Sequence, residues 1–308
     1  MDGLADHLRN AYGVDVAEVS ELDHRVRRVR LEDGGEWVAR VFAPQRPRAA
    51  VDADAEVLRR LEEGGFPAER LAVAEPVTMF GDRAVLVTRF IRGERPRGGR
   101  AWAILGALLG IVHSRAADWA SPGGAWHHLS DGTPRDEIAA ATELLERVRS
   151  EAPVRQLAAI GTVLDELERL DGGDDLPQAL VHPDFVPVNA IDDQDADPEQ
   201  AGRGVVVIDW TGAGRGPRIW SLAFLLWAGG ARHPKLVDAV VARYRRRIMP
   251  EAEELDRLGA VIRGRPLLLD CWRIAHRGHP PSEVVAQLPE LHRLSDVIAD
   301  RARRAFSE

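Results

Sequence analysis

The sequence predicts an α+β fold of two lobes, with a small antiparallel sheet in residues 1–93 and a mainly helical lobe in residues 94–308. Three observations support this prediction. The first part of the chain alternates apolar and charged side chains at the two-residue period of strands. Most of the remaining chain repeats its apolar residues at helical spacing. A chain of 308 residues also exceeds what a single hydrophobic core usually holds.

The strands of the first lobe are predicted to pair as hairpins. Val or Leu alternates with charged residues in "RVRRVRLE" and again in "EWVARVFA", and "DGG" between them is a turn signal. A second pair meets at the turn Gly81–Asp82, and residues 92–100, rich in Gly, Pro and Arg, predict the connection between the lobes. The predicted strands of this lobe are residues 25–32, 36–43, 74–80 and 83–91.

Helices are predicted from apolar spacing and from end signals. Val57, Leu58 and Leu61 lie at helical spacing, and Thr133 is a suitable N-cap before Pro134 at the first helical position. Two further strands, residues 178–184 and 204–210, flank an acidic loop, and the chain from residue 217 is again mostly helical. The other predicted helices are residues 52–65, 101–119, 133–150 and 153–170.

Composition excludes several functional classes. The formal net charge of -8 makes the chain a poor partner for phosphate backbones, so no nucleic-acid binding is expected. The single cysteine, Cys271, cannot form an internal disulfide and lies in the apolar stretch "LLLDCWRIA". The N-terminus lacks the features of a signal peptide, and the longest apolar run is too short to span a bilayer. We therefore expect a cytoplasmic protein without membrane association, present as a monomer or homodimer.

The stretch "LVHPDFVPVNAI" contains the strongest chemical signal. His182, Asp184 and Asn189 form the pattern H-x-D-x-x-x-x-N, and Asp209 ends the apolar run "GVVVI" where a strand would leave the core. In phosphoryl transfer, one carboxylate orients the acceptor hydroxyl and takes its proton, while other oxygen ligands hold Mg²⁺ on the nucleotide phosphates. The Asp-to-Asn spacing matches the catalytic loop of kinases. The set therefore predicts a phosphoryl-transfer site.

The motifs "VHPDFVPVNAI" and "VVVIDWTGAGRGPRIWSLA" together resemble the aminoglycoside phosphotransferase and choline kinase-like family, small-molecule kinases with a protein-kinase-like two-lobe fold. The order of elements is similar over most of the chain. The resemblance implies that Asp184 is the catalytic residue and that Asn189 and Asp209 bind Mg²⁺. It also implies that His182 is structural and bonds the backbone around the metal site. ATP or GTP is the implied phosphoryl donor, and a hydroxyl group of a small molecule is the acceptor.

The resemblance further implies nucleotide-binding residues in the first lobe. Arg40, in "EWVARVF", takes the place of the basic residue that binds the α- and β-phosphates, and Lys235 is the only lysine of the chain. Arginine can bind phosphate bidentately. Glu56, in "DAEVLRRL", matches the helix glutamate that holds this basic residue in place. The alternative for Arg40 and Glu56 is two solvated surface charges.

Two positions depart from the family pattern. The nucleotide-covering loop is expected within "VSELDHRVRRV", which contains no glycine. Either the Arg25 side chain and neighbouring amides cover the phosphates, or nucleotide binding is weak or altered. Ser221 stands where the family commonly has an Asp that anchors the catalytic loop, which puts the rigidity of this loop in doubt. The nucleobase is expected against Thr88, Phe90 and Ile91.

Other nucleotide and nucleophile motifs are incomplete. In "GAGRG" the third glycine of a dinucleotide fingerprint would fall at Pro217, and the run follows Asp209 instead of opening a βαβ unit. We interpret it as a turn after the metal-binding strand. The position of the sole lysine excludes a Walker A loop, and no G-x-S-x-G elbow is present.

Three functional hypotheses remain. The first is a kinase of an aminoglycoside or other cationic antibiotic, motivated by the acidic loop 192–199 and the negative net charge. The second is a metabolic kinase acting on an amino alcohol, sugar or amino acid. The third is a kinase-like nucleotide-binding protein without transfer activity, motivated by the glycine-free loop, Arg40 and Ser221. Against the third stands the intact set Asp184, Asn189 and Asp209.

Overall fold

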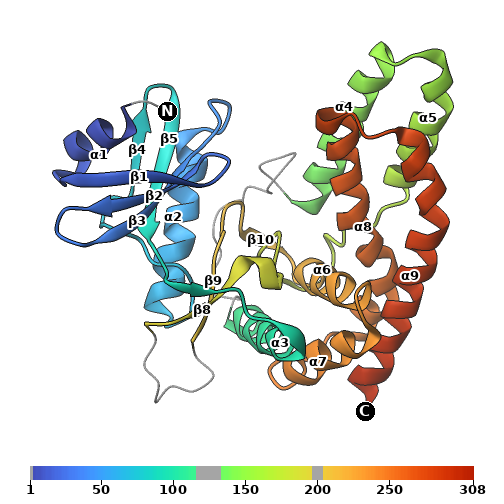
Figure 1. The fold of residues 1–308 in the computed structure, drawn as a ribbon. Helices are drawn as coiled ribbons and strands as arrows, with labels where there is room; N and C mark the ends of the chain where they lie inside the picture. Colours follow the sequence, from blue (N-terminus) through green and yellow to red (C-terminus); the bar gives the residue numbers. More distant parts are fainter. Residues whose placement is uncertain (1–2, 116–132, 196–203) are drawn as a thin grey trace. The chain divides into compact units, whose positions relative to one another are not determined.

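The computed structural model describes residues 3–115, 133–195 and 204–308 and divides into two compact units (Figure 1). The first unit consists of Met1–Arg95 and Ala190–Thr211, and the second of Pro96–Asn189 and Gly212–Glu308. A small antiparallel sheet in the first unit and helices in most of the second confirm the predicted α+β class. These units differ from the predicted lobes 1–93 and 94–308 in two respects, because the first boundary falls after Arg95 and residues 190–211 belong to the unit of the sheet.

The first unit is built on a five-stranded antiparallel sheet in the order β1-β2-β3-β5-β4. The four predicted strands are present. The edge strand β1 is an addition, and its acid-rich, mostly exposed sequence "VAEVSELD" does not show the alternation that indicates a buried face. The strands are β1 (Val16–Asp23), β2 (Val26–Leu31), β3 (Glu36–Val41), β4 (Val77–Phe80) and β5 (Arg83–Arg89).

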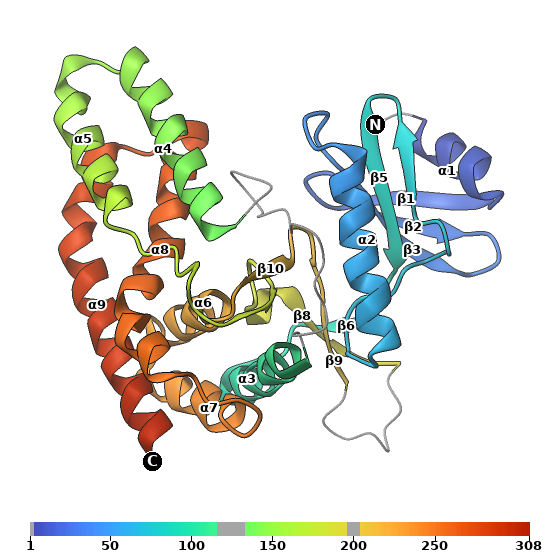
Figure 2. The same ribbon diagram turned by 180° about the vertical axis from the view of Figure 1, so that it is seen from behind.

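The two faces of this sheet have different partners. Alternation along β3 places Trp37, Ala39 and Val41 in a core with Leu4 and Leu8 of helix α1 (Leu4–Tyr12). The intervening residue of β3, Arg40, lies on the other face together with Leu86 and Thr88 of β5, toward helix α2 (Arg48–Glu63). Figure 2 shows α2 running along the sheet. The two-residue period of the strand therefore directs the charged side chain of Arg40 toward α2.

A second, three-stranded sheet explains why residues 190–211 join the first unit. Its strands are β6 (Gly93–Glu94), β8 (Ala190–Asp193) and β9 (Val205–Val207), in the order β6-β8-β9. The amide of Val207 donates to the carbonyl of Pro67 over 2.9 Å, and the amide of Glu69 donates to the carbonyl of Val207 over 3.1 Å. These bonds fix the segment after α2 beside the strand that leads to Asp209.

The second unit is mainly helical, as predicted. The N-cap predicted at Thr133 is present and forms a capping box, because its hydroxyl accepts from the Asp136 amide and the Asp136 carboxylate accepts from the Thr133 amide. Within the described ranges, no helix combines the length and apolarity needed to cross a membrane. The helices are α3 (Gly98–Arg115), α4 (Pro134–Glu151), α5 (Val154–Glu168), α6 (Ile219–Gly230), α7 (Pro234–Tyr244), α8 (Ala252–Arg277) and α9 (Pro281–Ser307).

Close packing in this unit depends on glycine at particular places. A Cβ atom on Gly106 of α3 would lie 2.4 Å from the carbonyl oxygen of Val240 in α7, so only glycine allows these helices to touch. Beside them, β7 (Gln178–Val181) pairs with β10 (Gly214–Pro217), so the predicted turn in "GAGRG" is confined to its first residue, Gly212, and the rest of the run leads into a strand. The end of the predicted helix 101–119 lies outside the described residues, as does part of the acidic loop 192–199.

The buried His113 predicts a loss of stability in acid. Its Nδ1 lies 2.9 Å from the Tyr244 hydroxyl, and burial, with a smaller contribution from Arg218, lowers its pKa to about 3. Between pH 6.5 and that value the imidazole takes up a proton only in the unfolded chain. Acidification should therefore lower the free energy of unfolding by about 1.4 kcal/mol per pH unit through this residue.

Denaturant titrations between pH 7 and 4.5 check this expectation. As the pH falls, the His113→Phe variant should lose stability less steeply than the wild type. The slope of its free energy of unfolding against pH should be smaller by the equivalent of one bound proton. The buried carboxyl groups of Glu69 and Glu137 have pKa values that are raised, first by burial, and they change stability with pH in the opposite direction. Both proteins contain these groups, so the difference between their slopes isolates His113. Equal slopes for the two proteins would contradict the assignment.

Candidate active site

The catalytic-loop motif is held together by its own backbone. After β7, His182 is fully buried, and its Nδ1 accepts a hydrogen bond from the Asp184 amide over 3.0 Å. Asn189, at the end of a short 3-10 turn, donates from Nδ2 to the Asp184 carbonyl over 3.0 Å. The predicted structural role of His182 is confirmed. The loop therefore brings Asp184 and Asn189 together, as the five-residue spacing predicts.

Ser221 anchors this loop in place of an aspartate. Its hydroxyl accepts from the His182 amide over 3.0 Å and donates to the His182 carbonyl over 2.8 Å. Ser221 is buried at the start of α6, so these bonds are shielded from water. The doubt about the rigidity of this loop is not supported, because the one hydroxyl of Ser221 bonds both the amide and the carbonyl of His182.

A buried arginine holds the side chain of Asp184. Arg265 of α8 donates to Asp184 Oδ1 from Nη2 over 2.7 Å and from Nε over 3.2 Å. Its Nη1 donates to Oε1 of Glu137 in α4 over 2.9 Å. Burial by itself would lower the pKa of Arg265, but the two carboxylates outweigh it and the pKa is raised. Arg265 and Glu137 are absent from the predicted site, and no motif in the local sequence marks either of them.

In the first unit, Arg40 forms an ion pair with Asp209. The distance from Nη1 to Oδ1 is 2.5 Å, and about one fifth of each side chain is exposed (20% and 24%). Burial opposes the charge of Arg40, but Asp209 and then Glu69 favour it, so its pKa is raised. Asp209 has φ 64°, a left-handed conformation that is uncommon for a residue other than glycine.

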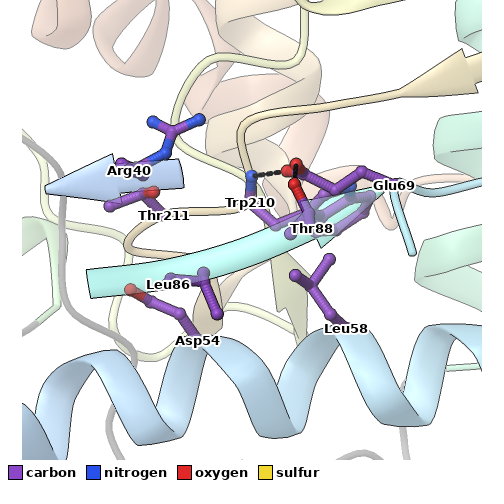
Figure 3. A pocket seen from close by; sticks show the side chains of 8 residues that line it. All are labelled: Arg40, Asp54, Leu58, Glu69, Leu86, Thr88, Trp210 and Thr211. Carbon is purple, nitrogen blue, oxygen red and sulfur yellow. Dashed lines mark hydrogen bonds between the residues drawn. The ribbon is translucent and has the colours of Figure 1, made fainter. Parts of the chain in front are cut away.

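Glu69 supports the backbone of Asp209. Its Oε1 accepts from the amide of Asp209 over 2.7 Å. The same oxygen accepts from the amide of Trp210 over 3.3 Å, and Oε2 accepts from the Thr88 hydroxyl over 3.2 Å (Figure 3). Glu69 is 8% exposed, and its pKa is raised, first by burial. Glu69 was not predicted as a site residue. It stabilises the left-handed turn that presents the Asp209 side chain.

These side chains surround a small recess between α2 and the sheet (Figure 3). Asp54 and Leu58 of α2 lie opposite Leu86 and Thr88 of β5. The side chain of Thr88, predicted to contact the nucleobase, is buried here and bonded to Glu69. The full lining is Arg40, Asp54, Leu58, Glu69, Leu86, Thr88, Trp210 and Thr211.

The predicted pairing of Glu56 with Arg40 is wrong. The Glu56 carboxylate accepts from Arg59 over 2.5 Å and from Arg60 over 2.8 Å on the exposed side of α2. Asp54 is the acid of α2 that lines the recess with Arg40, and it also pairs with Arg46 over 2.8 Å. Two residues turn a helix by about 200°, so Glu56 and Asp54 lie on opposite faces.

The remaining predicted nucleotide contacts lie outside this recess. Arg25, with φ 62°, is in the two-residue turn between β1 and β2, where the His24 amide already donates to the Asp23 side chain over 2.6 Å. Phe90 is half-buried, and the Arg28 guanidinium lies 4.3 Å from its ring centroid. Ile91 is also half-buried. The structure does not bring these three residues together with Arg40 in one pocket.

The donor set fits magnesium better than a transition metal. Among the residues that the structure describes, no three His, Cys, Asp or Glu side chains are grouped to hold an ion. Magnesium in nucleotide enzymes uses one or two protein ligands, with phosphates and water completing the shell. Asn189 donates through its nitrogen, so its amide oxygen is the atom that can face a cation. The Asp209 carboxylate is already paired with a cationic group, Arg40.

Residues 15–256 match the model of the phosphotransferase enzyme family. The chain belongs to this family. The resemblance drawn from the two motifs is thereby confirmed, and the chain is an enzyme of the phosphotransferase class. No curated protein matches the chain.

Solved structures with the same fold include three small-molecule kinases. The amicoumacin kinase hAmiN in complex with AMP-PNP, Ca²⁺ and Ami has a TM-score of 0.65 and 15% identity, covering 98% of this chain and 94% of that chain. The aminoglycoside-3'-phosphotransferase of type VIII has a TM-score of 0.60 and 22% identity, covering 88% of this chain and 98% of that chain. The choline kinase LicA from Streptococcus pneumoniae has a TM-score of 0.59 and 13% identity, covering 99% of this chain and 97% of that chain. This phosphotransferase therefore has the protein-kinase-like fold.

The support that Glu69 gives to Asp209 predicts a measurable stability difference within the phosphotransferase. Glu69→Ala should lower the free energy of unfolding by about 1–3 kcal/mol, because the buried amides of Asp209 and Trp210 lose their acceptor. Glu56→Ala is the matched control and should change it by less than about 1 kcal/mol, since its pairs are largely exposed. Urea titrations of both variants would show whether the two glutamates differ.

Proposed function

We propose that the phosphotransferase moves the γ-phosphoryl group of ATP or GTP to a hydroxyl group of a small molecule, with Mg²⁺ bound. The observation that carries this proposal is the built catalytic loop, in which His182 and Asn189 fix the backbone of Asp184 and Arg265 binds its carboxylate. Family membership supports the reaction class. The nucleotide analogue and divalent ion bound to the amicoumacin kinase support the donor and the need for a metal.

Asp184 is proposed as the residue that aligns the acceptor. Its carboxylate accepts a hydrogen bond from the acceptor hydroxyl and takes the proton as the oxygen–phosphorus bond forms and the bond to the leaving nucleoside diphosphate breaks. Asn189, through its amide oxygen, and Asp209 would hold Mg²⁺, which neutralises charge on the phosphates. Arg40 would bind the α- and β-phosphates, with Asp54 in the position that we had predicted for Glu56.

The proposed acceptor is a small cationic molecule with a hydroxyl group, such as an aminoglycoside. The net charge of -8 favours a cationic partner, and two of the structures with this fold are an amicoumacin kinase and an aminoglycoside-3'-phosphotransferase. A metabolic kinase of an amino alcohol is the second candidate, favoured by the comparable similarity to a choline kinase. A nucleotide-binding protein without transfer is the third, motivated by the glycine-free stretch between β1 and β2 and by Arg40 in place of lysine.

One experiment tests the three candidates together. Purified protein is incubated with Mg²⁺ and ATP or GTP across a panel of aminoglycosides, other cationic antibiotics, amino alcohols, sugars and amino acids, and phosphorylated product is measured by mass spectrometry. Product from an antibiotic supports the first candidate, and product from a metabolite supports the second. Nucleotide binding without product on any acceptor supports the third. Absence of product on every acceptor would contradict the proposed transfer, and absence of nucleotide binding as well would contradict all three candidates.

A further inference from the structure

Arg265 occupies a segment of α8 that is shaped around it. A Cβ atom on the preceding Gly264 would lie 2.6 Å from Trp220, so glycine is needed for the helix to approach this ring. The following Pro266 cannot donate the usual helical hydrogen bond, which opens the turn before it. Arg265 itself is 2% exposed. The sequence Gly264-Arg265-Pro266 therefore places a full positive charge in the interior of the helical unit.

The contacts of Arg265 connect three elements of that unit. Two of its N–H groups converge on Oδ1 of Asp184 in the catalytic loop, and a third binds Glu137 in the first turn of α4. The face of Phe224 lies 5.7 Å from the guanidinium carbon. The guanidinium group presents its donors in a rigid planar fork and so restrains the orientation of a carboxylate, whereas the three donors of a lysine ammonium group rotate freely around a point charge.

Stability alone is a weak reason for this arrangement. Desolvation of a buried ion pair can exceed the attraction within it, and apolar side chains of similar volume often stabilise a core equally well. Glu137 is 1% exposed, and its Oε2 has no hydrogen-bond partner within the described part of the chain. A network that leaves a buried carboxylate oxygen unpaired is not optimised for stability. The one oxygen that receives two donors is that of Asp184.

We propose that Arg265 is a positioning residue that fixes the orientation of the Asp184 carboxylate, and that Glu137 in turn holds Arg265. This inference rests on the proposed function, because it assumes that Asp184 aligns the acceptor hydroxyl. Arg265 acts through Asp184 and contacts neither reactant. Phosphoryl transfer depends on the angle at which the acceptor oxygen meets phosphorus, and a misplacement of about 1 Å can reduce turnover by about 10²-fold.

Arg265→Lys tests the proposal because it keeps the charge and removes the fork. We expect kcat to fall by about 10²-fold, while KM for the nucleotide stays within about twofold. Glu137→Ala should lower kcat by a smaller factor. The double variant should be no slower than Arg265→Lys, since both changes release the same carboxylate. Steady-state kinetics are measured with the best acceptor of the panel.

Arg218→Lys is the matched control. Arg218 forms a comparable, mostly buried ion pair with Glu254, with donor–acceptor distances of 2.9 and 2.5 Å. Its kcat should match that of the wild type when both proteins are assayed well below their melting temperatures. The midpoint of thermal unfolding is recorded for every variant, so that lost activity can be separated from lost folded protein.

Two outcomes overturn the positioning role while the proposed function stands. One is an active wild type whose kcat is unchanged in folded Arg265→Lys. The other is an equal loss of kcat in Arg265→Lys and Arg218→Lys that follows the loss of folded protein, which would make Arg265 merely structural. A wild type without turnover on any acceptor overturns the proposed function, and the positioning role with it.

Discussion

Asp184→Asn should lower kcat by about 10²–10⁴-fold and leave the dissociation constant of the nucleotide nearly unchanged. Asparagine keeps the shape of the side chain but cannot take the proton of the acceptor hydroxyl. It can still accept hydrogen bonds from Arg265 through its amide oxygen, so the loop should keep its conformation. Turnover is measured by product formation, and nucleotide affinity by calorimetry, on the same preparation.

The control for this variant is Asp174→Asn in the same unit. Asp174 pairs with Arg135 on the surface and lies outside the catalytic loop, so its kinetics should match the wild type. Thermal unfolding of the two variants is compared as well, because Arg265 retains a carboxylate partner only in Glu137 when Asp184 is replaced. Turnover of Asp184→Asn close to that of the control would contradict the assignment of Asp184 as the catalytic residue.

Asp209→Asn should remove the dependence of nucleotide binding on magnesium. Replacing a residue that hydrogen-bonds to a metal ligand typically weakens metal binding by about 10–100-fold, and loss of a direct ligand should weaken it at least as much. In the wild type, chelation of Mg²⁺ with EDTA should weaken nucleotide binding to the same degree. In the variant, chelation should change it little, because the ion is already poorly held.

The exposed Asp82 provides the control for this experiment. Its side chain is 77% exposed in the turn between β4 and β5 of the same unit, so Asp82→Asn should bind nucleotide like the wild type at every Mg²⁺ concentration. Unfolding midpoints are again needed, because Arg40 loses its ion-pair partner when Asp209 is replaced. If the variant kept the wild-type response to Mg²⁺, Asp209 would not be a metal ligand.

The parts of the fold that could be predicted are those encoded locally. The helix α4 begins at Pro134 as expected, because Thr133 and Asp136 form their capping box within four residues. Helix α1 was missed because it is short and only Leu4 and Leu8 are buried in it. Strand β1 was missed because an edge strand with exposed acids lacks the apolar alternation of a half-buried strand.

In the candidate site, too, the contacts within a short stretch of sequence could be predicted, and the contacts between distant residues could not. His182, Asp184 and Asn189 lie within eight residues, and their hydrogen bonds follow from the loop itself. Arg265 lies 81 residues from Asp184, and Glu69 lies 140 residues from Asp209. Charged residues are common throughout the chain, and nothing in their local sequence indicates which ones become buried together. Tertiary packing decided these contacts.

The choice of Glu56 in place of Asp54 shows a third kind of limit. Both acids lie in the same helix, and the helix itself was predicted. The buried residues of α2 include Asp54, Leu58 and Leu61, so its inner face passes through Asp54. A motif match that is correct to within two positions therefore selected the wrong side of the helix. Register within an element needs the burial pattern as well as the motif.

The membership of residues 190–211 in the sheet unit has a consequence for the nascent chain. Translation delivers Met1–Arg95 first, but Thr211, the last residue of this unit, is made 116 residues later. At about 5–20 residues per second, the ribosome takes roughly 6–23 s to cover that interval. During that time Glu69 has neither of its amide partners. Strands β1–β5 therefore emerge from the ribosome well before the segment that carries Asp209, and the unit is complete only after the catalytic loop has been made.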